Sequence, residues 1–430
     1  MMAVALSLVA VVACVELSPT VVDQDELPGE PITVELQIPW SQFGSNLEVF
    51  GGYGSPEDLG EGVVANVFEG TLNARTLLRF GPFPEEVTVR DSTGTSRPDT
   101  DLTFIGARFV AFFDTIASTN TGPVTLRLGS TLSEWDAATA SWNFAIDTIN
   151  DQRAWTEPGG GPVGDLGTSV WNPITGDSVQ FMLDSATVAG WSDPSDLTAG
   201  ARLDLIDMGL RLQVLGARLM LQVRPSIAPD TVIEVSSLTS EVTFIYDPSP
   251  PPPPDGVRIG GAPAWRTVLD VAVPTTLTGP PEFCAVISCP HELNAGQVSS
   301  AALVLTSRAT DPAFQPTDTI GLDVRPISNR AAMPKAPLGV SLIPDPFGRQ
   351  VGPLAFGALA GEQIEVPFTL FARNQLRGTD EDGNPAPGTL ALLSVFEPFS
   401  LAFASFDGPG SVNEPFLRLV LTIGPSVQLP

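Results

Sequence analysis

Cysteine and histidine are the side chains of this 430-residue chain best suited to covalent or metal chemistry, and they are few. Cys284 and Cys289 enclose a short loop, and the only histidine, His291, lies two residues after Cys289. In an exported protein, two cysteines at this separation favour a disulfide. The alternative is a metal site that uses His291, but zinc takes about four ligands and this segment offers too few. We therefore predict a disulfide between Cys284 and Cys289.

The third cysteine, Cys14, ends an apolar run that begins at Ala3. The run is too short to span a bilayer, which needs about 20 residues, and it lies where a signal peptide has its apolar region. The ending Val11-Val12-Ala13-Cys14 is typical of bacterial lipoprotein signals, in which the cysteine carries the lipid. We expect residues 1–14 to be such a signal, with lipidation at Cys14, and residues 15–30 to be a flexible leash.

Two alternatives to this interpretation stay open. No Lys or Arg follows Met1 and Met2, so the true start could lie upstream, or the segment could be an ordinary cleaved signal peptide. Val15 rather than Asp follows the cysteine, which by the sorting rules of enteric bacteria predicts the outer membrane. The sequence does not distinguish a periplasmic from an external position.

Five tryptophans of the first half are candidates for ligand contact: Trp135, Trp142, Trp155, Trp171 and Trp191. Exposed tryptophan faces stack on sugars, and an apolar groove with a few polar groups is a common binding site. The alternative is that these rings fill a core. Trp142 lies on an alternating strand and is expected inside, whereas Trp155 and Trp191 lie in loop-like segments and are expected outside. The predicted ligand-binding residues are therefore Trp155, Trp191 and Trp135.

A calcium site is a weaker candidate, formed by Asp380, Asp382 and Asn384 on one turn. Calcium takes about six to eight oxygen ligands, and this turn lacks the closing Glu of an EF-hand. We expect an acidic surface turn, with calcium as the alternative, and no other cofactor.

Catalysis is not expected. The chain has one histidine and no Gly-x-Ser-x-Gly motif, so a serine triad has almost no support. Paired carboxylates can hydrolyse glycosides, and Glu134 and Asp136 flank Trp135, but nothing distinguishes this pair among 49 acidic residues. The formal charge of −28 also argues against nucleic acid as a partner.

Strands are expected to position these residues. Short apolar and β-branched runs recur between Gly, Pro, Asp and Ser clusters, as in sandwiches and barrels. Four runs show this clearly: Ile32–Ile38, Val87–Val89, Val124–Leu128 and Val242–Tyr246. A helix competes only over residues 201–223, where Gly209 and Gly216 disfavour it. We predict two strands there, joined near Gly216.

The clearest boundary is the proline run at residues 248–254, which favours a stiff polyproline II segment. A proline run can also dock in an aromatic-lined groove, but a spacer between two strand-rich halves is the simpler interpretation. We predict an all-β protein with two tandem jelly-roll-like β-sandwich modules, residues 31–247 and 255–430, joined by this polyproline linker.

Several segments of the first half, taken in order, resemble the DNRLRE domain. They are Leu77-Leu78-Arg79-Phe80, Ala107-Arg108-Phe109-Val110, and the segment of residues 133–143 bracketed by Trp135 and Trp142; Glu414-Pro415-Phe416-Leu417 resembles the closing strand. The second half lacks the tryptophan pair, and long insertions intervene. The resemblance implies jelly-roll-type β-sandwiches on bacterial surfaces, some of them treated as carbohydrate-binding modules. The lysine-poor composition also resembles lipoproteins of Gemmatimonadota type.

Together these observations predict a cell-envelope lipoprotein that is a non-catalytic structural or adhesive binding protein. The alternative is a carbohydrate-binding module protein that retains polysaccharide at the cell surface. The expected partners are the membrane, through the lipid on Cys14, and either a polysaccharide or another envelope protein.

Overall fold

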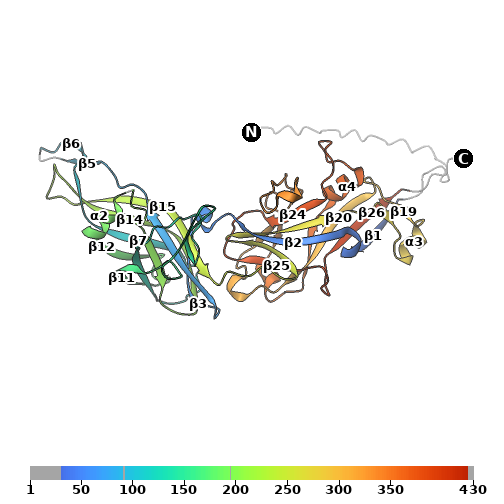
Figure 1. Cartoon of the computed structure of the whole chain (residues 1–430), viewed down its shortest axis with the longest axis horizontal. Helices are drawn as coiled ribbons and strands as arrows, with labels where there is room; N and C mark the ends of the chain where they lie inside the picture. Colours follow the sequence, from blue (N-terminus) through green and yellow to red (C-terminus); the bar gives the residue numbers. More distant parts are fainter. Residues whose placement is uncertain (1–30, 91–92, 194, 425–430) are drawn as a thin grey trace, which may run out of the picture.

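Antiparallel β-sheets build two lobes that lie end to end along the long axis of the molecule (Figure 1). The computed structural model describes residues 31–90, 93–193 and 195–424. Each lobe has its own large sheet, and only short helices accompany the strands. The predicted all-β, sandwich-type fold is therefore confirmed.

The first lobe is one sheet that curls around an apolar core. Its strands run in the order β11-β8-β13-β4-β15-β14-β7-β12, with β3 paired to β14 and β4. Although β11 and β12 are the two ends of this order, they lie close to each other. The strands of this sheet are β3 (Gly62–Phe68), β4 (Leu72–Phe80), β7 (Leu102–Asp114), β8 (Val124–Thr131), β11 (Val163–Trp171), β12 (Ser178–Asp184), β13 (Ala201–Leu205), β14 (Leu210–Pro225) and β15 (Ile233–Asp247).

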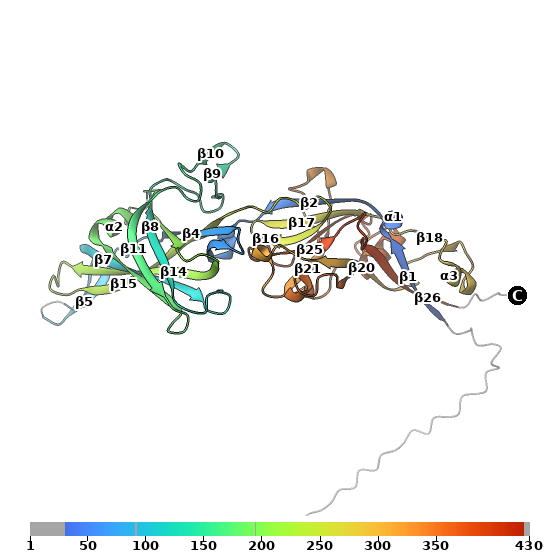
Figure 2. The same cartoon turned by 90° about the horizontal axis from the view of Figure 1, so that it is seen from below.

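Smaller elements cover this sheet. The hairpin of β9 and β10 belongs to the long connection between β8 and β11, residues 132–162, which we call the excursion. It lies outside the curled sheet (Figure 2). The smaller elements of the first lobe are the 3₁₀ helix η2 (Pro56–Leu59), the hairpin β5 (Val87–Arg90) with β6 (Ser96–Asp99), the hairpin β9 (Phe144–Thr148) with β10 (Asp151–Ala154), and α2 (Ser185–Trp191).

The second lobe is a sandwich whose two sheets share β20 (Val298–Arg308). Most of β20 pairs with β26 and β23 in one sheet, and its last two residues pair with β25 in the other. The apolar core lies between these sheets. The remaining strands are β1 (Ile32–Pro39), β2 (Gly44–Tyr53), β16 (Gly256–Gly261), β17 (Ala264–Val271), β18 (Thr276–Leu277), β19 (His291–Glu292), β21 (Ile320–Pro326), β22 (Arg349–Val351), β23 (Gln363–Pro367), β24 (Thr389–Ser394), β25 (Phe403–Asp407) and β26 (Phe416–Ile423).

Short helices complete the second lobe. They are α1 (Trp40–Phe43), α3 (Pro281–Val286), α4 (Thr369–Arg377), and the 3₁₀ helices η3 (Pro312–Phe314), η4 (Arg330–Ala332) and η5 (Pro353–Phe356). Of these, α4 packs against β20.

The division into residues 31–247 and 255–430 is wrong at its start. β1 pairs along its whole length with β26, and β2 pairs with β17, so residues 32–53 belong to the second lobe. Alternating apolar residues predicted β1 as a strand but could not specify its partner. The first lobe is therefore inserted into the second, and the chain crosses between the lobes twice, at residues 54–61 and at 248–255.

One glycine has a different role from the predicted one. The chain turns between β13 and β14 at Gly209, which has φ +78°, and not at Gly216. Gly216 lies inside β14, where the register against β7 shifts and the strand bulges. A bulge with a glycine at positive φ lets a long strand bend without ending it.

Candidate functional site

Three neighbouring strands of the first lobe, β8, β13 and β4, carry a cluster of arginines on one face. Because side chains alternate along a strand, the leucines next to Arg127 and Arg202 point into the curled core, while the arginines point outward. The register places Asp204 of β13 directly opposite Arg127 of β8. The same outer face presents Arg202 of β13 and Arg75 of β4.

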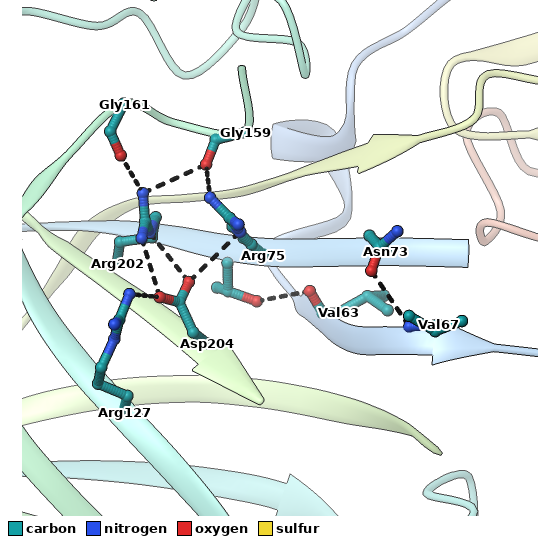
Figure 3. A network of polar contacts seen from close by, with 10 residues as sticks. Val63, Val67, Asn73, Arg75, Arg127, Gly159, Gly161, Arg202 and Asp204 are labelled. Atoms are coloured by element: carbon teal, nitrogen blue, oxygen red, sulfur yellow. Dashed lines mark hydrogen bonds and ion pairs between the residues drawn. The ribbon is translucent and has the colours of Figure 1, made fainter. Parts of the chain in front are cut away.

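The arginines converge on Asp204 (Figure 3). Arg202 forms a two-pronged ion pair with it, from Nε to Oδ1 and from Nη2 to Oδ2, both at 2.9 Å. Arg127 Nη2 donates to Oδ2 at 2.8 Å, and Arg75 Nε lies 3.7 Å from Oδ1. The Arg202 side chain is only 3% exposed, so the centre of the cluster is screened from water.

Backbone carbonyls take up further guanidinium donors. Arg202 Nη1 donates to the carbonyls of Gly159 and Gly161, and Arg75 also donates to Gly159. Residues 159–161 are three successive glycines at positive φ. A Cβ at Gly159 would lie 2.8 Å from Arg75 Nη1. Only glycine therefore allows this turn to bring its carbonyls onto two guanidinium groups.

Beside the cluster is an open cleft of about 490 Å³. Its charged lining consists of Arg75, Arg127, Arg202, Glu157 and Asp165. Burial lowers the pKa of Arg75, the Asp204 carboxylate opposes this, and Arg202 and Arg127 add to the lowering. With Asp204 included, three cations face three carboxylates, so the cluster neutralises itself and fastens the excursion of residues 132–162 to the sheet.

The tryptophans predicted to be exposed are buried, so this expectation is wrong. Trp155 is 5% exposed and Trp191 is 8% exposed, and Trp135 is 2% exposed. Trp155 Nε1 donates to the carbonyl of Ser141 at 2.8 Å. Trp191, at the end of α2, stacks on Phe80 with a centroid distance of 5.6 Å. Trp142, which was expected inside, is only half-buried and packs against the cluster that contains Trp135 and Trp155.

Arginines of β4 pack on two of these rings. The guanidinium of Arg79 lies 4.3 Å from the ring centroid of Trp135, and that of Arg75 lies 5.0 Å from the ring of Trp142. Arg79 also donates to the carbonyls of Trp135 and Leu197, both at 3.0 Å. Cation–π packing of this kind joins the excursion to the strand. The sequence signal for it was the spacing of Arg75 and Arg79, which are four residues apart and so lie on one face of β4.

The disulfide between Cys284 and Cys289 is present, as predicted. It links Cys284 of α3 to Cys289, which follows the helix. Phe283, next to Cys284, is 2% exposed and belongs to the core of the second lobe. The His291 ring meets Phe283 edge-on at 6.2 Å. The disulfide therefore holds a core aromatic residue at the end of the second lobe, and its sulfurs are not free for a metal.

The acidic turn is held by its own hydrogen bonds. Asp380 Oδ1 accepts the backbone N–H groups of Asp382, at 3.0 Å, and Asn384, at 2.8 Å. Slight burial raises the pKa of Asp380, but these bonds and the Asn384 side chain outweigh it and lower that pKa overall. Within the described residues, no group of three or more His, Cys, Asp or Glu side chains is arranged to hold a metal.

Cys14 and the predicted signal peptide lie outside the described residues. Within the described ranges, no helix has the length and apolarity needed to cross a bilayer. Comparisons with protein-family models and with curated proteins found no match to this chain. The resemblance to DNRLRE domains therefore stays a prediction.

Proposed function

We propose that this chain is a cell-envelope lipoprotein whose two fused β lobes form a stiff, non-catalytic structural or adhesive binding protein. The observation that carries the proposal is the junction between the lobes. Two chain crossings and a continuous apolar core join them, which is what a load-bearing or spacing element needs. A single flexible linker would give two independent modules instead.

The apolar core at the junction draws on both lobes. Phe314 of the second lobe stacks on Phe403 at 5.5 Å and meets Tyr246 of the first lobe at 6.1 Å. Burial raises the pKa of Tyr246 to about 12. The first lobe contributes Val63, Ala65, Phe68, Leu72, Ala74 and Phe244 to this core, and the second contributes Ala262, Ala313, Phe314, Leu401 and Phe403.

The placement of β1 indicates which lobe would lie next to the membrane. β1 follows the predicted leash directly, and it is a strand of the second lobe. A lipid on Cys14 would thus hold the second lobe next to the membrane and project the inserted first lobe away from it. The partner-binding surface is then expected on the first lobe. The strongly negative chain would not approach anionic headgroups on its own, so the lipid is the expected attachment.

The carbohydrate-binding alternative has less support. It relied on Trp155, Trp191 and Trp135 as a stacking platform, and all three are buried in the first lobe. A sugar site would therefore need other residues.

Membrane attachment is tested by a Cys14→Ser variant expressed in a bacterial host with lipoprotein processing. We expect the wild-type chain in the membrane fraction, carrying acyl chains by mass spectrometry, and Cys14→Ser unacylated and outside it. Ser18→Ala, in the predicted leash, is the matched control and should behave as wild type. Unchanged membrane attachment of Cys14→Ser would contradict the lipid anchor.

The binding role is tested separately on a glycan array and by envelope cross-linking with the wild-type mature chain. The proposal expects no specific glycan signal and cross-links to another envelope protein. Saturable binding of one glycan class would favour the alternative instead.

A further inference from the structure

Arg258 of β16 is a buried cation without a carboxylate partner among the described residues. The residue is 9% exposed, and its guanidinium lies 4.2 Å from the ring centroid of Phe403 and 5.0 Å from that of Trp265. Its Nη1 donates to the carbonyl of Pro251 at 2.5 Å, but its buried Nε has no hydrogen-bond partner. A buried guanidinium without a counter-ion lowers the stability of the fold unless another group compensates its charge.

The proline segment 248–254 lies against this arginine and is not a free spacer. Pro250 and Pro253 are half-buried, while the other prolines of the run are exposed. A polyproline II helix repeats every three residues, so Pro250 and Pro253 mark the face that is turned toward the second lobe. The proline run therefore docks within its own chain, against the second lobe, and Arg258 holds its Pro251 carbonyl.

Between the proline segment and the second lobe is a cavity of about 320 Å³. This volume falls within the usual range for small-ligand sites, which is about 300–1,000 Å³. Its apolar walls are the prolines together with Val257, Phe314, Phe403 and Phe406. Its charged lining is Arg258 in the interior, with Arg308 and Asp311.

The two further charged groups are already engaged. Arg308, whose side chain is 46% exposed, donates to the carbonyl of Asp255 at 2.9 Å and lies 4.0 Å from its carboxylate. Asp311 Oδ1 accepts the N–H of Ala313 at 3.0 Å and so caps η3. Asp311 is exposed, so Arg258 is the buried charged group of the cavity lining that has no ion pair among the described residues.

We propose that this cavity binds a small organic carboxylate, with the carboxylate on Arg258 and an apolar body between the proline segment and Phe403. A carboxylate supplies the counter-charge that the guanidinium of Arg258 lacks. Walls of proline, valine and phenylalanine suit an apolar body better than a phosphate. This site goes beyond the proposed envelope function and does not depend on the lipid anchor.

The charge state of Arg258 agrees with this role. Burial lowers the pKa of Arg258 to about 10, against an opposing effect of Tyr246. The guanidinium therefore stays protonated at neutral pH and can pair with an anion.

The test is a calorimetric titration of the whole mature chain with benzoate at neutral pH, compared with benzamide, its uncharged analogue. We expect one benzoate per chain and no measurable benzamide binding. Arg258→Gln should weaken benzoate binding by about tenfold or more. Arg349→Gln removes an exposed arginine of the same lobe outside the cavity and should bind benzoate as wild type does.

A second variant keeps the test valid if Arg258→Gln does not fold. Ala309 is exposed and lines the cavity, so Ala309→Trp should block it without disturbing the core. Loss of benzoate binding in a folded Ala309→Trp protein supports the site. The proposal is overturned if benzoate does not bind, if benzamide binds equally well, or if Ala309→Trp binds benzoate undiminished.

Discussion

Asp204 is the residue on which the arginine cluster on the outer face of the first lobe depends. It is the one carboxylate that Arg75, Arg127 and Arg202 contact together, and two of these arginines also hold the glycine turn. Without it, three guanidinium groups would face one another at short range. We expect the outer face of β13 to be more sensitive to mutation than its polar character suggests.

Replacing this carboxylate tests that dependence. Asp204→Asn should lower the free energy of unfolding by about 3 kcal/mol, because it leaves the buried Arg202 without a counter-ion. Guanidinium chloride unfolding followed by tryptophan fluorescence measures the change. Asp165→Asn, an exposed carboxylate of the same cleft, is the control and should change little. Equal stability of the two variants would count against the shared-carboxylate interpretation.

The buried tryptophans give a second prediction at this scale. Trp155→Ala and Trp191→Ala should each cost about 3–5 kcal/mol of stability, as truncation of a buried aromatic residue does. Thermal unfolding monitored by circular dichroism measures the loss. Ile116→Ala, at a side chain that is 94% exposed, should leave the melting temperature nearly unchanged. Melting temperatures near wild type for both tryptophan variants would show that these rings do not support the lobe.

Some features at the residue scale could be predicted from the sequence and others could not. The disulfide could be predicted because its two cysteines are close in the sequence and because the chain was expected to be exported, where disulfides form. The exposure of Trp155 could not, because a loop-like composition indicates irregular backbone and not whether that backbone folds onto a sheet. The three-arginine cluster could not be predicted either, since its members come together only through the pairing of β8, β13 and β4.

Strands were the best predicted elements. The alternating runs correspond to β1, β5, β8 and β15, and the segment of residues 201–223 does contain two strands. The pairing of the strands could not be predicted, because alternation shows which side of a strand is apolar but does not specify the neighbouring strand. β1 was therefore assigned to the wrong lobe, although the run Ile32–Ile38 was correctly predicted as a strand.

The assignment of β1 can be tested at its apolar face. Leu36→Asp places a charge in the core of the second lobe, so it should destabilise that lobe and leave the first lobe intact. Hydrogen exchange with mass spectrometry should show lost protection in β26 and unchanged protection in β14. Gln37→Asp, at the neighbouring exposed position, is the matched control. Lost protection in β14 without any change in β26 would contradict the strand pairing.

The two lobes are expected to stay joined because the chain passes between them twice. A cut in one crossing leaves β1 and β2 paired with strands from the other side of the cut. The apolar junction adds a contact that does not depend on either crossing. The junction is therefore expected to survive cleavage of the proline segment.

A protease site inserted between Pro252 and Pro253 tests this expectation. After cleavage, the two fragments should co-elute in native size-exclusion chromatography at the volume of the uncut protein. They should separate only in denaturant. Two smaller native species after cleavage would show that the proline segment alone holds the lobes together.

The pairing of Ile32 with Ile423 also has a consequence for the order of folding. All strands of the first lobe lie in one uninterrupted stretch of chain, so they can assemble while later residues are still being synthesised. β1 must wait for β26, and closing so long a loop is slow. The lobe that begins the chain is thus expected to be completed last, around an already folded insert. A chain stopped before residue 416 would leave the edge of β1 open, and unpaired edges of this kind attract other strands.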